Sequence, residues 1–463
     1  MSQGYDVLVI GGGPGGYVAA LRASQLGARV ALVEDKFIGG VCLNVGCIPT
    51  KALLRSAEVY QLVRDAQTFG VRVDGSVEAD WPAMQKRKAQ VVRRLTTGVQ
   101  GLLRRAGVAV LDGGGRFVDA RTVEVVNGEG TQRVQAAKVI VATGSRPIRL
   151  PLPGFDLPGV LDSTGALALE ALPERLLIVG GGVIGAEFAA IFSALGVQVT
   201  VVEMLDRMLP MMDVDVSAEI AKSLKRQNVQ IYLGSRANGI VPAGEGLRVS
   251  VGTPKGEQGF EVDKVLVSVG RRANVEDVGL ESVGVRTSGA GVDVNDQMET
   301  SAPGVYAVGD VTGQWWLAHV ASAQGVVAAE NSCGHTAKMN YKSVPSCVFT
   351  RPEVASVGLT EAQAREKGYD VLTGQFPFRA NGKALTYGDY EGFVKVVSER
   401  QYEEVLGVHI VGPHASDLIL EGGLALSMEA TLDEIEATIH AHPTLGESIA
   451  EAALAARGRA LHL

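Results

Sequence analysis

Short apolar runs bounded by glycine clusters alternate along this chain with small-residue segments of helical length. The runs Tyr5 to Ile10 and Leu176 to Val179 each have the length and apolar character of a buried strand. Each run leads into a glycine cluster and then into an alanine-rich segment. These segments end at Gly27 and Gly196, which fit the residue that follows the last turn of a helix. Alternating strands and helices of this kind predict an α/β fold with parallel sheets.

The two segments are copies of one pattern, offset by 169 residues. In each copy a second strand follows the helix and ends in an acidic residue, Glu34 in the first copy and Glu203 in the second. This acid lies 23 residues after the first glycine of its own cluster, Gly11 or Gly180. Ordinary glycine-rich turns are a poor explanation for two copies with equal spacing. The duplication predicts two similar domains.

Each glycine cluster matches the G-x-G-x-x-G pattern of dinucleotide-binding folds in its full context of strand, helix, strand and acid. The first glycine permits the turn, the second lets a pyrophosphate approach the backbone, and the third lets helix and strand pack closely. The helix N-terminus then receives the phosphate charge. The glycines are Gly11, Gly13 and Gly16 in the first copy and Gly180, Gly182 and Gly185 in the second.

Glu34 and Glu203 are each expected to accept a hydrogen bond from a ribose hydroxyl. An acid at Glu203 disfavours a ribose 2′-phosphate, and Arg207 is the one arginine in the segment that follows. The second nucleotide is therefore predicted to be NAD and not NADP. Two nucleotide sites in one chain suggest that electrons pass between two cofactors.

Composition limits the classes of protein to which the chain can belong. Its 463 residues suggest about three domains. The net charge of -8 argues against a nucleic-acid binder. The uncharged stretch Val7 to Leu21 is interrupted by glycines and a proline, and falls short of the ~18 apolar residues of a membrane span. The first residues show no secretory pattern, so we expect a cytoplasmic protein without a membrane partner.

Cys42 and Cys47 are a close pair in a chain with four cysteines, too few for a disulfide scaffold. On an ideal helix their Cα atoms would stand about 8–9 Å apart, beyond the ~7 Å limit for a disulfide. A bridge would need a distorted turn, and Gly46 and Pro49 fit a broken helix start. A redox-active pair is the favoured interpretation; a zinc half-site and two inert thiols are the alternatives. Because no second close pair of ligands exists, we expect no metal site.

The segment from His440 to Glu447 places histidines beside a carboxylate. Thr444 and Glu447 have the spacing of a capping box, so Glu447 could simply bond the helix start. An imidazole oriented by a carboxylate is also the usual form of a general base. Thiol chemistry needs such a base, since the thiolate is the nucleophile. The residues alone therefore leave two interpretations of this segment, a helix cap and a candidate general base.

Taken together, these motifs resemble the dihydrolipoamide dehydrogenases of the disulfide-containing flavoprotein reductase family. The resemblance extends over essentially the whole chain. It rests on residues 11–16, 40–49 and 142–145, the second fingerprint with Glu187, residues 306–310, and residues 440–444 with Glu447.

The resemblance implies FAD at the first fingerprint and NAD at the second. It implies that Cys42 exchanges disulfides with the substrate and that Cys47 faces the flavin. Lys51 would lie near the flavin, paired with Glu187. His442 would be the base and Glu447 its orienting carboxylate. Further implied cofactor contacts are Asp310, Gly115, Thr143, Gly144, Ser145 and Ala318 for FAD, and Gly270 for NAD.

The family also implies an activity and partners. The activity is oxidation of protein-bound dihydrolipoamide to lipoamide with reduction of NAD+. The partners are a second copy, in a homodimer whose active sites combine two subunits, and the lipoyl domains and E2 core of a 2-oxo acid dehydrogenase complex. One position departs from the family. Gln324 lies in the helix after Ala318, where an acidic residue is usual.

The resulting architecture is two Rossmann-like dinucleotide-binding domains plus a C-terminal α+β dimerisation domain. We expect the FAD domain at residues 1–148 with a central continuation at 271–343. The NAD domain is expected at 149–270 and the dimerisation domain at 344–463. Rival functions are an NADPH-dependent reductase of the glutathione type, a mercuric reductase, and a non-catalytic flavoprotein redox sensor. The last residues contain no cysteine pair of the mercuric type.

Overall fold

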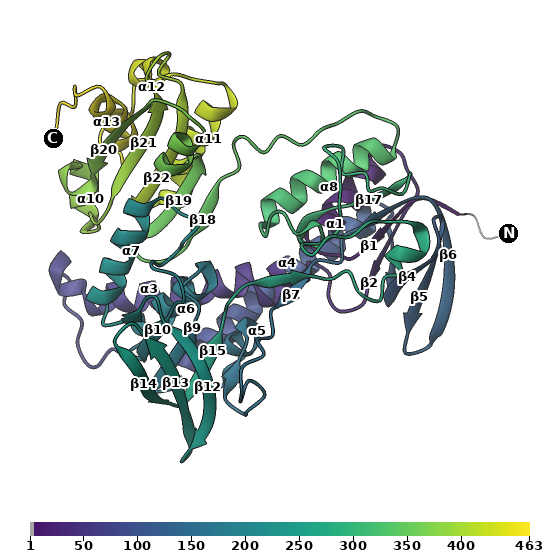
Figure 1. Ribbon diagram of the computed structural model, residues 1–463, viewed down its shortest axis with the longest axis horizontal. Coiled ribbons are helices and arrows are strands. Elements are labelled where there is room, and N and C mark those ends of the chain that lie inside the picture. Colours follow the sequence, from purple (N-terminus) through teal and green to yellow (C-terminus); the bar gives the residue numbers. More distant parts are fainter. Residues whose placement is uncertain (1–3) are drawn as a thin grey trace. The chain divides into compact units, whose positions relative to one another are not determined.

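The computed structural model describes residues 4–463 (Figure 1). Its contacts divide the chain into two compact units. Unit 1 comprises the residues up to Leu53, Trp81–Ile148 and Gly270–Asn340. Unit 2 comprises Leu54–Asp80, Arg149–Val269 and Tyr341–Leu463. Each unit is described separately.

A parallel sheet forms the centre of unit 1, in the order β3-β2-β1-β6, with β17 beside β6. The last four residues of β1 are buried, as expected for a central parallel strand covered on both faces. An antiparallel hairpin, β4 and β5, continues the sheet from β6. The strands are β1 (Tyr5–Ile10), β2 (Val30–Glu34), β3 (Ala109–Asp112), β4 (Gly114–Asp119), β5 (Thr122–Asn127), β6 (Gly130–Val141) and β17 (Val305–Ala307).

Helices of unit 1 pack closely where glycines remove side-chain bulk. Helices α1 (Pro14–Gln25) and α8 (Ala318–Ser332) meet at Gly325, where an added Cβ would lie 2.4 Å from the carbonyl oxygen of Gly15. The remaining helices are α2 (Gly40–Val45), α3 (Cys47–Arg64), which continues into unit 2, and α4 (Trp81–Arg105). The strands β7 (Ser145–Pro147) and β16 (Arg271–Ala273) pair antiparallel. They lie where the chain leaves unit 1 and where it returns.

The first part of unit 2 repeats the parallel arrangement, in the order β11-β10-β9-β15-β8. Helix α6 (Val183–Ala194) is buried over most of its length. The parallel strands are β8 (Val160–Leu161), β9 (Arg175–Val179), β10 (Gln198–Val202), β11 (Gln230–Tyr232) and β15 (Lys264–Val267). Helices α5 (Ser163–Leu167) and α7 (Val214–Arg226) and an antiparallel sheet of β12 (Arg236–Ala243), β13 (Gly246–Thr253) and β14 (Gly256–Val262) complete this part.

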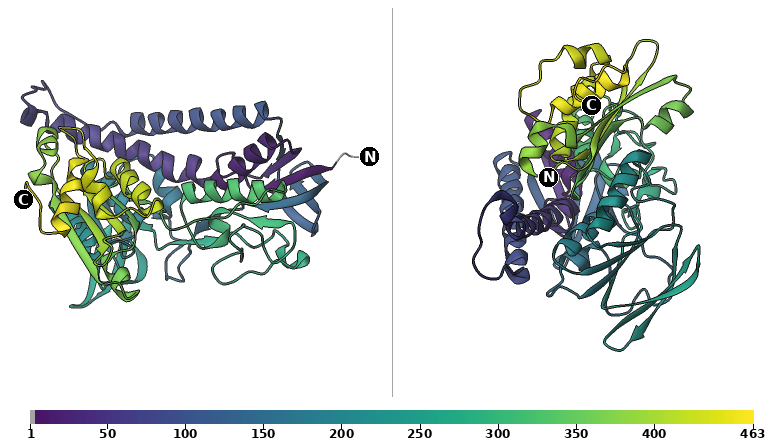
Figure 2. Two further views of the ribbon diagram at one scale, coloured as in Figure 1. Left: turned by 90° about the horizontal axis from the view of Figure 1, so that it is seen from above. Right: turned by 90° about the vertical axis from the view of Figure 1, so that its left-hand side faces the viewer.

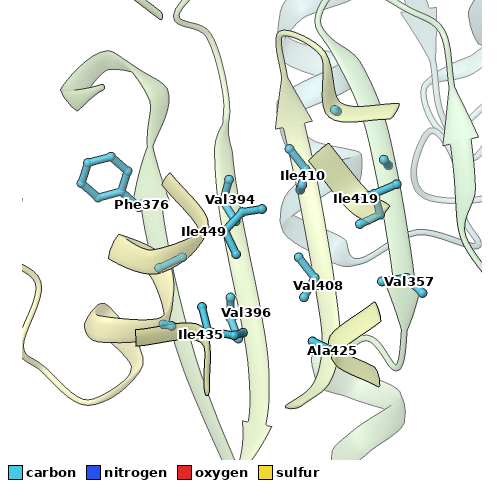
Figure 3. Packing of buried hydrophobic residues seen from close by; sticks show 14 of the residues in the cluster. Val357, Phe376, Val394, Val396, Val408, Ile410, Ile419, Ala425, Ile435 and Ile449 are labelled. Atoms are coloured by element: carbon cyan, nitrogen blue, oxygen red, sulfur yellow. The ribbon is translucent and has the colours of Figure 1, made fainter. Parts of the chain in front are cut away.

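The C-terminal part of unit 2 is an antiparallel sheet with helices. The strand order is β18-β19-β22-β21-β20. Figure 3 shows Val394 and Val396 of β21 in the apolar core with Ile435 and Ile449 of the covering helices. The strands are β18 (Ser346–Val348), β19 (Glu353–Gly358), β20 (Val371–Pro377), β21 (Phe393–Glu399) and β22 (Val405–Gly412). The helices are α9 (Glu361–Glu366), α10 (Gly382–Tyr387), α11 (Ala415–Ser427), α12 (Leu432–Ala437) and α13 (Glu447–Ala456).

A buried lysine joins the two parts of unit 2. Lys395 of β21 is 3% exposed, and its Nζ lies 3.0 Å from Asp213, 2.6 Å from Asp215 and 3.0 Å from Glu361. Asp213 caps α7. Burial opposes the ionisation of Asp213, but its interactions with His409 and Lys395 hold its pKa below the ordinary value. The α/β fold with two Rossmann-like sheets and a C-terminal antiparallel domain is confirmed. No helix within residues 4–463 is long and apolar enough to span a membrane.

Candidate functional site

The first glycine cluster is shaped by close backbone contacts. Gly11 has φ +107°, and a Cβ on it would lie 2.2 Å from the carbonyl oxygen of Ala142. A Cβ on Gly16 would lie 1.8 Å from the carbonyl oxygen of Gly11. Gly13 differs, since the nearest atom to its added Cβ is Gly40 Cα at 3.9 Å. Gly11 and Gly16 are therefore required by the fold, while Gly13 borders open space at the start of α1.

The second cluster repeats this geometry. Gly180 has φ +110°, and its added Cβ would lie 2.5 Å from the carbonyl oxygen of Ser268. Gly185 would place a Cβ 1.9 Å from the carbonyl oxygen of Gly180, while nothing lies within 4 Å of a Cβ on Gly182. Gly182 precedes the first turn of α6 and makes no side-chain cap. The open space at this positive helix end fits a pyrophosphate, as it does in the first cluster.

The acidic residues at the ends of the second strands, Glu34 and Glu203, accept hydrogen bonds from backbone N–H groups of neighbouring loops. In the first fold Oε2 of Glu34 accepts a hydrogen bond from the backbone N–H of Gly12 at 2.6 Å, and Oε1 accepts one from the backbone N–H of Lys36 at 2.9 Å. In the second, Glu203 accepts from the N–H of Gly181 at 2.5 Å and from that of Leu205 at 2.7 Å. A carboxylate offers about four acceptor positions. Each carboxylate can therefore accept these backbone hydrogen bonds and still contact a ribose hydroxyl as expected. The sequence did not predict the backbone hydrogen bonds.

A polar network surrounds Asp310, which follows β17. The hydroxyl of Ser145 donates to Asp310, and Nε of Arg271 donates to Ser145 Oγ at 2.7 Å. Nε of Arg271 also lies 3.8 Å from Asp310. Burial raises the pKa of Asp310, and contacts with Ser145 and Arg271 offset part of this effect. Arg271 was missed by sequence reasoning, although it directly follows the predicted contact Gly270.

Asn274 holds the loop that contains Thr143 and Gly144. The hydroxyl of Thr143 donates to the carbonyl oxygen of Asn274 at 2.7 Å, and the amide of Asn274 donates to the carbonyl oxygen of Thr143 at 2.9 Å. The N–H of Asn274 donates to the carbonyl oxygen of Gly144 at 2.9 Å. Asn274 lies far from this loop in the sequence, and its role could not be read from any local pattern.

The other predicted FAD contacts occupy strand and helix ends of unit 1. Gly115 of β4 would place a Cβ 2.9 Å from a methyl group of Ile10, so glycine allows β4 to approach β1. Ala318 is the first residue of α8. Gln324 on the same helix is fully buried, and its side-chain oxygen accepts a hydrogen bond from the N–H of Gly309 at 2.7 Å. An amide oxygen can thus accept this bond in place of the family's usual carboxylate.

The cysteine pair lies across a break between two helices. Helix α2 ends at Val45, Gly46 has φ -141° and ψ -114°, and α3 begins at Cys47. The expected distorted turn at Gly46 is confirmed. Both cysteines are free thiols in the structure. The interaction of the Cys42 thiol with Cys47, together with burial, raises the pKa of Cys42, and the charge of nearby Lys51 partly opposes the shift.

The C-terminal histidine and carboxylate are in direct contact. Nδ1 of His442 lies 2.8 Å from Oε1 of Glu447, and the N–H of Thr444 donates to Oε2 at 2.7 Å. Burial works against the ionised form, but the bonds from Thr444 and His442 hold the pKa of Glu447 below its ordinary value. Glu447 therefore does both things expected of it: it accepts a hydrogen bond from the backbone at the start of the helix, and it contacts the ring of His442.

The neighbouring histidine is held in a different way. The side chain of His440 is 10% exposed and its Nε2 lies 2.9 Å from Glu421 of α11, whereas the side chain of His442 is 79% exposed. The exposure of His442 suits a group that meets a substrate. The burial of His440 suits a structural contact.

Glu187 lies inside unit 2 on α6 and is 3% exposed. Its Oε1 accepts a hydrogen bond from the N–H of Phe349 at 3.0 Å. The backbone of Phe349 thus orients this carboxylate, which no sequence pattern indicated. The pairing of Glu187 with Lys51 stays a prediction. Within the described residues, no group of three or more histidine, cysteine or acidic side chains is arranged to hold a metal ion.

Comparison with known families identifies the class of protein. Residues 5–325 match the pyridine nucleotide-disulphide oxidoreductase model, and residues 344–453 match the dimerisation domain of the same family. The chain belongs to the pyridine nucleotide-disulphide oxidoreductases. It is an FAD-containing oxidoreductase that uses a pyridine nucleotide, and its C-terminal domain makes it a homodimer.

Individual relatives indicate which members of this family the chain is similar to. The chain is 44% identical over 474 residues to a dihydrolipoyl dehydrogenase of Bacillus subtilis, with 100% of both chains covered. It is 46% identical over 464 residues to that of Thermus scotoductus, with 99% of each covered. Both relatives agree with the resemblance drawn from the sequence, which is confirmed.

Two solved structures are similar to this chain over nearly its whole length. LpdA of Mycobacterium tuberculosis is similar with a TM-score of 0.90 and 32% identity, over 97% of this chain and 99% of that one. The HOCl-induced flavoprotein disulfide reductase RclA of Escherichia coli, in its Cu(II) complex, has a TM-score of 0.88 and 29% identity over the same shares.

Proposed function

We propose that this chain oxidises protein-bound dihydrolipoamide to lipoamide and reduces NAD+, as the E3 component of a 2-oxo acid dehydrogenase complex. The observation that carries the proposal is the position of Cys42 and Cys47 on either side of the helix break at Gly46. Full-length relatives at 44% and 46% identity, all named dihydrolipoyl dehydrogenase, support it. Location in the cytoplasm stays a prediction.

The residues of the chain perform the thiol chemistry. His442, oriented through Nδ1 by Glu447, takes a proton from a dihydrolipoyl thiol at its Nε2. The resulting thiolate attacks Sγ of Cys42 and forms a mixed disulfide, and Cys47 leaves as a thiolate. The second substrate thiol then attacks the substrate sulfur of the mixed disulfide. This step releases oxidised lipoamide and leaves Cys42 reduced.

A base is needed because the attacking group is the thiolate, whereas a free thiol is mostly protonated near neutral pH. The bound flavin supplies the electron chemistry between this pair and the nicotinamide. Because the family builds each site from two subunits, His442 would serve the cysteine pair of the partner subunit.

The cofactor positions follow the two glycine clusters. FAD would occupy the first cluster, with Gly11, Gly13, Gly16, Glu34, Lys51, Gly115, Thr143, Gly144, Ser145, Asp310 and Ala318 as its contacts. NAD would occupy the second, with Gly180, Gly182, Gly185, Glu187, Glu203 and Gly270. These assignments correspond to an FAD domain at 1–148 and 271–343, an NAD domain at 149–270 and a dimerisation domain at 344–463.

The test is a direct comparison of substrates with the purified holoenzyme. Dihydrolipoamide with NAD+ should be turned over, and glutathione disulfide with NADPH should not. Preference for the second pair would establish the glutathione-type alternative. A holoenzyme inactive with both pairs would favour the redox-sensor alternative. Anaerobic reduction by dihydrolipoamide should produce a long-wavelength absorption band, and its absence would contradict the role of Cys47.

A further inference from the structure

Helix α4 carries a concentration of positive charge that the chain as a whole does not have. Its residues Trp81–Arg105 include no acidic side chain, while the complete chain has a net charge of -8. The basic residues are Lys86, Arg87, Lys88, Arg93, Arg94, Arg104 and Arg105. Like charges on one helix repel each other, so this composition does not stabilise the helix by itself.

The basic side chains form two neighbouring rows along the helix. Lys86, Arg93 and Arg104 are separated by seven and eleven residues, close to two and three turns, and therefore share one side. A second row starts one residue later and contains Arg87, Arg94 and Arg105. With the exception of half-buried Lys88, all the basic side chains of α4 are exposed.

Part of this positive charge is not neutralised within the fold. Within residues 4–463 no ion pair neutralises Arg93, Arg94 or Arg104. The apolar side of α4, which includes Trp81, Val99 and Leu103, is buried and supplies the packing. Figure 2 shows α4 as the long blue helix along the outside of unit 1 in the view from above. The basic face of α4 is thus exposed on the single chain.

Helix α4 is attached to the elements that carry the cysteine pair. It contacts α2, which contains Cys42. The guanidinium of Arg87 also donates a hydrogen bond to the carbonyl oxygen of Ala52 at 3.0 Å, on the helix that begins at Cys47. The positive face is therefore fixed to the same part of unit 1 as the redox pair.

We propose that the exposed basic face of α4, formed by Lys86, Arg93, Arg94, Arg104 and Arg105, attracts an acidic carrier domain that delivers the dihydrolipoyl group. The inference rests on the proposed function. A field of one sign near a site raises the encounter rate with an oppositely charged partner, and salt screens it. Free dihydrolipoamide is uncharged, so the field should leave its reaction unchanged.

The test compares Arg93→Gln/Arg94→Gln/Arg104→Gln with a control variant of equal charge change, Arg116→Gln/Arg121→Gln/Arg286→Gln. The control arginines are exposed residues of unit 1 outside α4. Each holoenzyme is assayed with free dihydrolipoamide and with a purified reduced lipoyl domain of net negative charge. A version of that domain with its surface Asp and Glu replaced by Asn and Gln is assayed in parallel. Ionic strength is varied from about 0.01 to 0.3 M.

The α4 variant should lose about tenfold in kcat/KM for the acidic domain at low ionic strength. Its salt dependence should flatten, and its kcat/KM for free dihydrolipoamide should stay unchanged. With the neutralised lipoyl domain as substrate, the α4 variant and wild type should have the same kcat/KM. Equal losses in the control variant, or unchanged kinetics with the acidic domain, would overturn the proposal. Selective binding of DNA by the α4 face without an effect on the acidic domain would overturn it too. No turnover of free dihydrolipoamide by wild type would instead refute the proposed function.

Discussion

Nδ1 of His442 lies 2.8 Å from a carboxylate oxygen of Glu447, in a segment where the histidine side chain is 79% exposed. Contact through Nδ1 fixes the ring and leaves Nε2 for a substrate proton. The second oxygen of Glu447 accepts the N–H of Thr444, so the carboxylate is held at both ends. This arrangement makes the histidine the first target for mutation.

Replacement of His442 by Gln should lower dihydrolipoamide-dependent NAD+ reduction by about 10²–10⁴-fold, since general base catalysis contributes that much. The measurement is steady-state kcat with dihydrolipoamide. NADH-dependent reduction of an artificial electron acceptor needs no thiol base and should persist. The matched variant His440→Gln, which removes the Glu421 contact, should retain most thiol activity. Equal losses in both variants would refute the base assignment.

The Glu447 carboxylate gives a pH-dependent contribution to stability. Its pKa is lower in the folded chain than in the unfolded chain, so its contribution is present above the unfolded value and disappears as pH falls through the folded value. Glu447→Gln should therefore lower the thermal midpoint at pH ~7, and the difference from wild type should shrink as the pH falls below ~4. The experiment is a series of thermal unfolding curves across this range. A difference that persists unchanged in acid would show that the carboxylate charge is not responsible.

Two glycines of the second cluster should respond differently to alanine. Gly182→Ala meets no atom within 4 Å, so folding should be unaffected, while the KM for NAD+ should rise about tenfold or more because the methyl group fills the space for the pyrophosphate. Gly185→Ala would place its Cβ 1.9 Å from the carbonyl oxygen of Gly180 and should reduce stability as well. Unfolding curves and NAD+ titrations separate the effects. Gly98→Ala on α4, which also meets no atom, is the control.

Replacement of Glu203 by Gln should weaken discrimination against NADPH. The neutral amide no longer repels a 2′-phosphate, and the ratio of kcat/KM for NADH to that for NADPH should fall about tenfold, or ~1.4 kcal/mol. Because the carboxylate accepts bonds from Gly181 and Leu205, some loss of NADH affinity should accompany the change. An unchanged ratio would mean that other residues select the nucleotide.

The buried Lys395 should be important for the stability of unit 2. Lys395→Met leaves Asp213, itself 1% exposed, without its buried cation. Breaking a buried pair costs about 3–5 kcal/mol, so the denaturant midpoint should fall clearly. Adding Asp213→Asn should recover part of the loss. Lys367→Met, at an exposed position, should have little effect. A Lys395 variant as stable as the control would contradict the expectation.

Local patterns predicted much of this molecule. Both glycine clusters, the ends of α1 and α6 at Gly27 and Gly196, and the helix break at Gly46 follow from backbone rules that act over a few residues. The contact between His442 and Glu447 is also local, since Glu447 is the first residue of α13 and His442 precedes it by five residues.

The remaining contacts depend on tertiary structure. Asn274 and Arg271 reach residues near position 145 because β7 and β16 pair. Phe349 acts through its backbone N–H, which every residue other than proline possesses. Lys395 looks like a surface lysine in a strand, and only the packing of α7 against the C-terminal sheet places it among carboxylates. No period or spacing in the sequence records such long-range neighbours.

The two nucleotide loops use nearly the same φ at Gly11 and Gly180 and the same carboxylate bracing at Glu34 and Glu203. Such equivalent loops can bind the diphosphate that both cofactors share, but they cannot discriminate between a flavin and a nicotinamide. The selection between the two must come from outside the repeated motif. In unit 1 the unique neighbours are the cysteine helix break and the Ser145–Asp310 network, which have no counterpart in the duplicated segment.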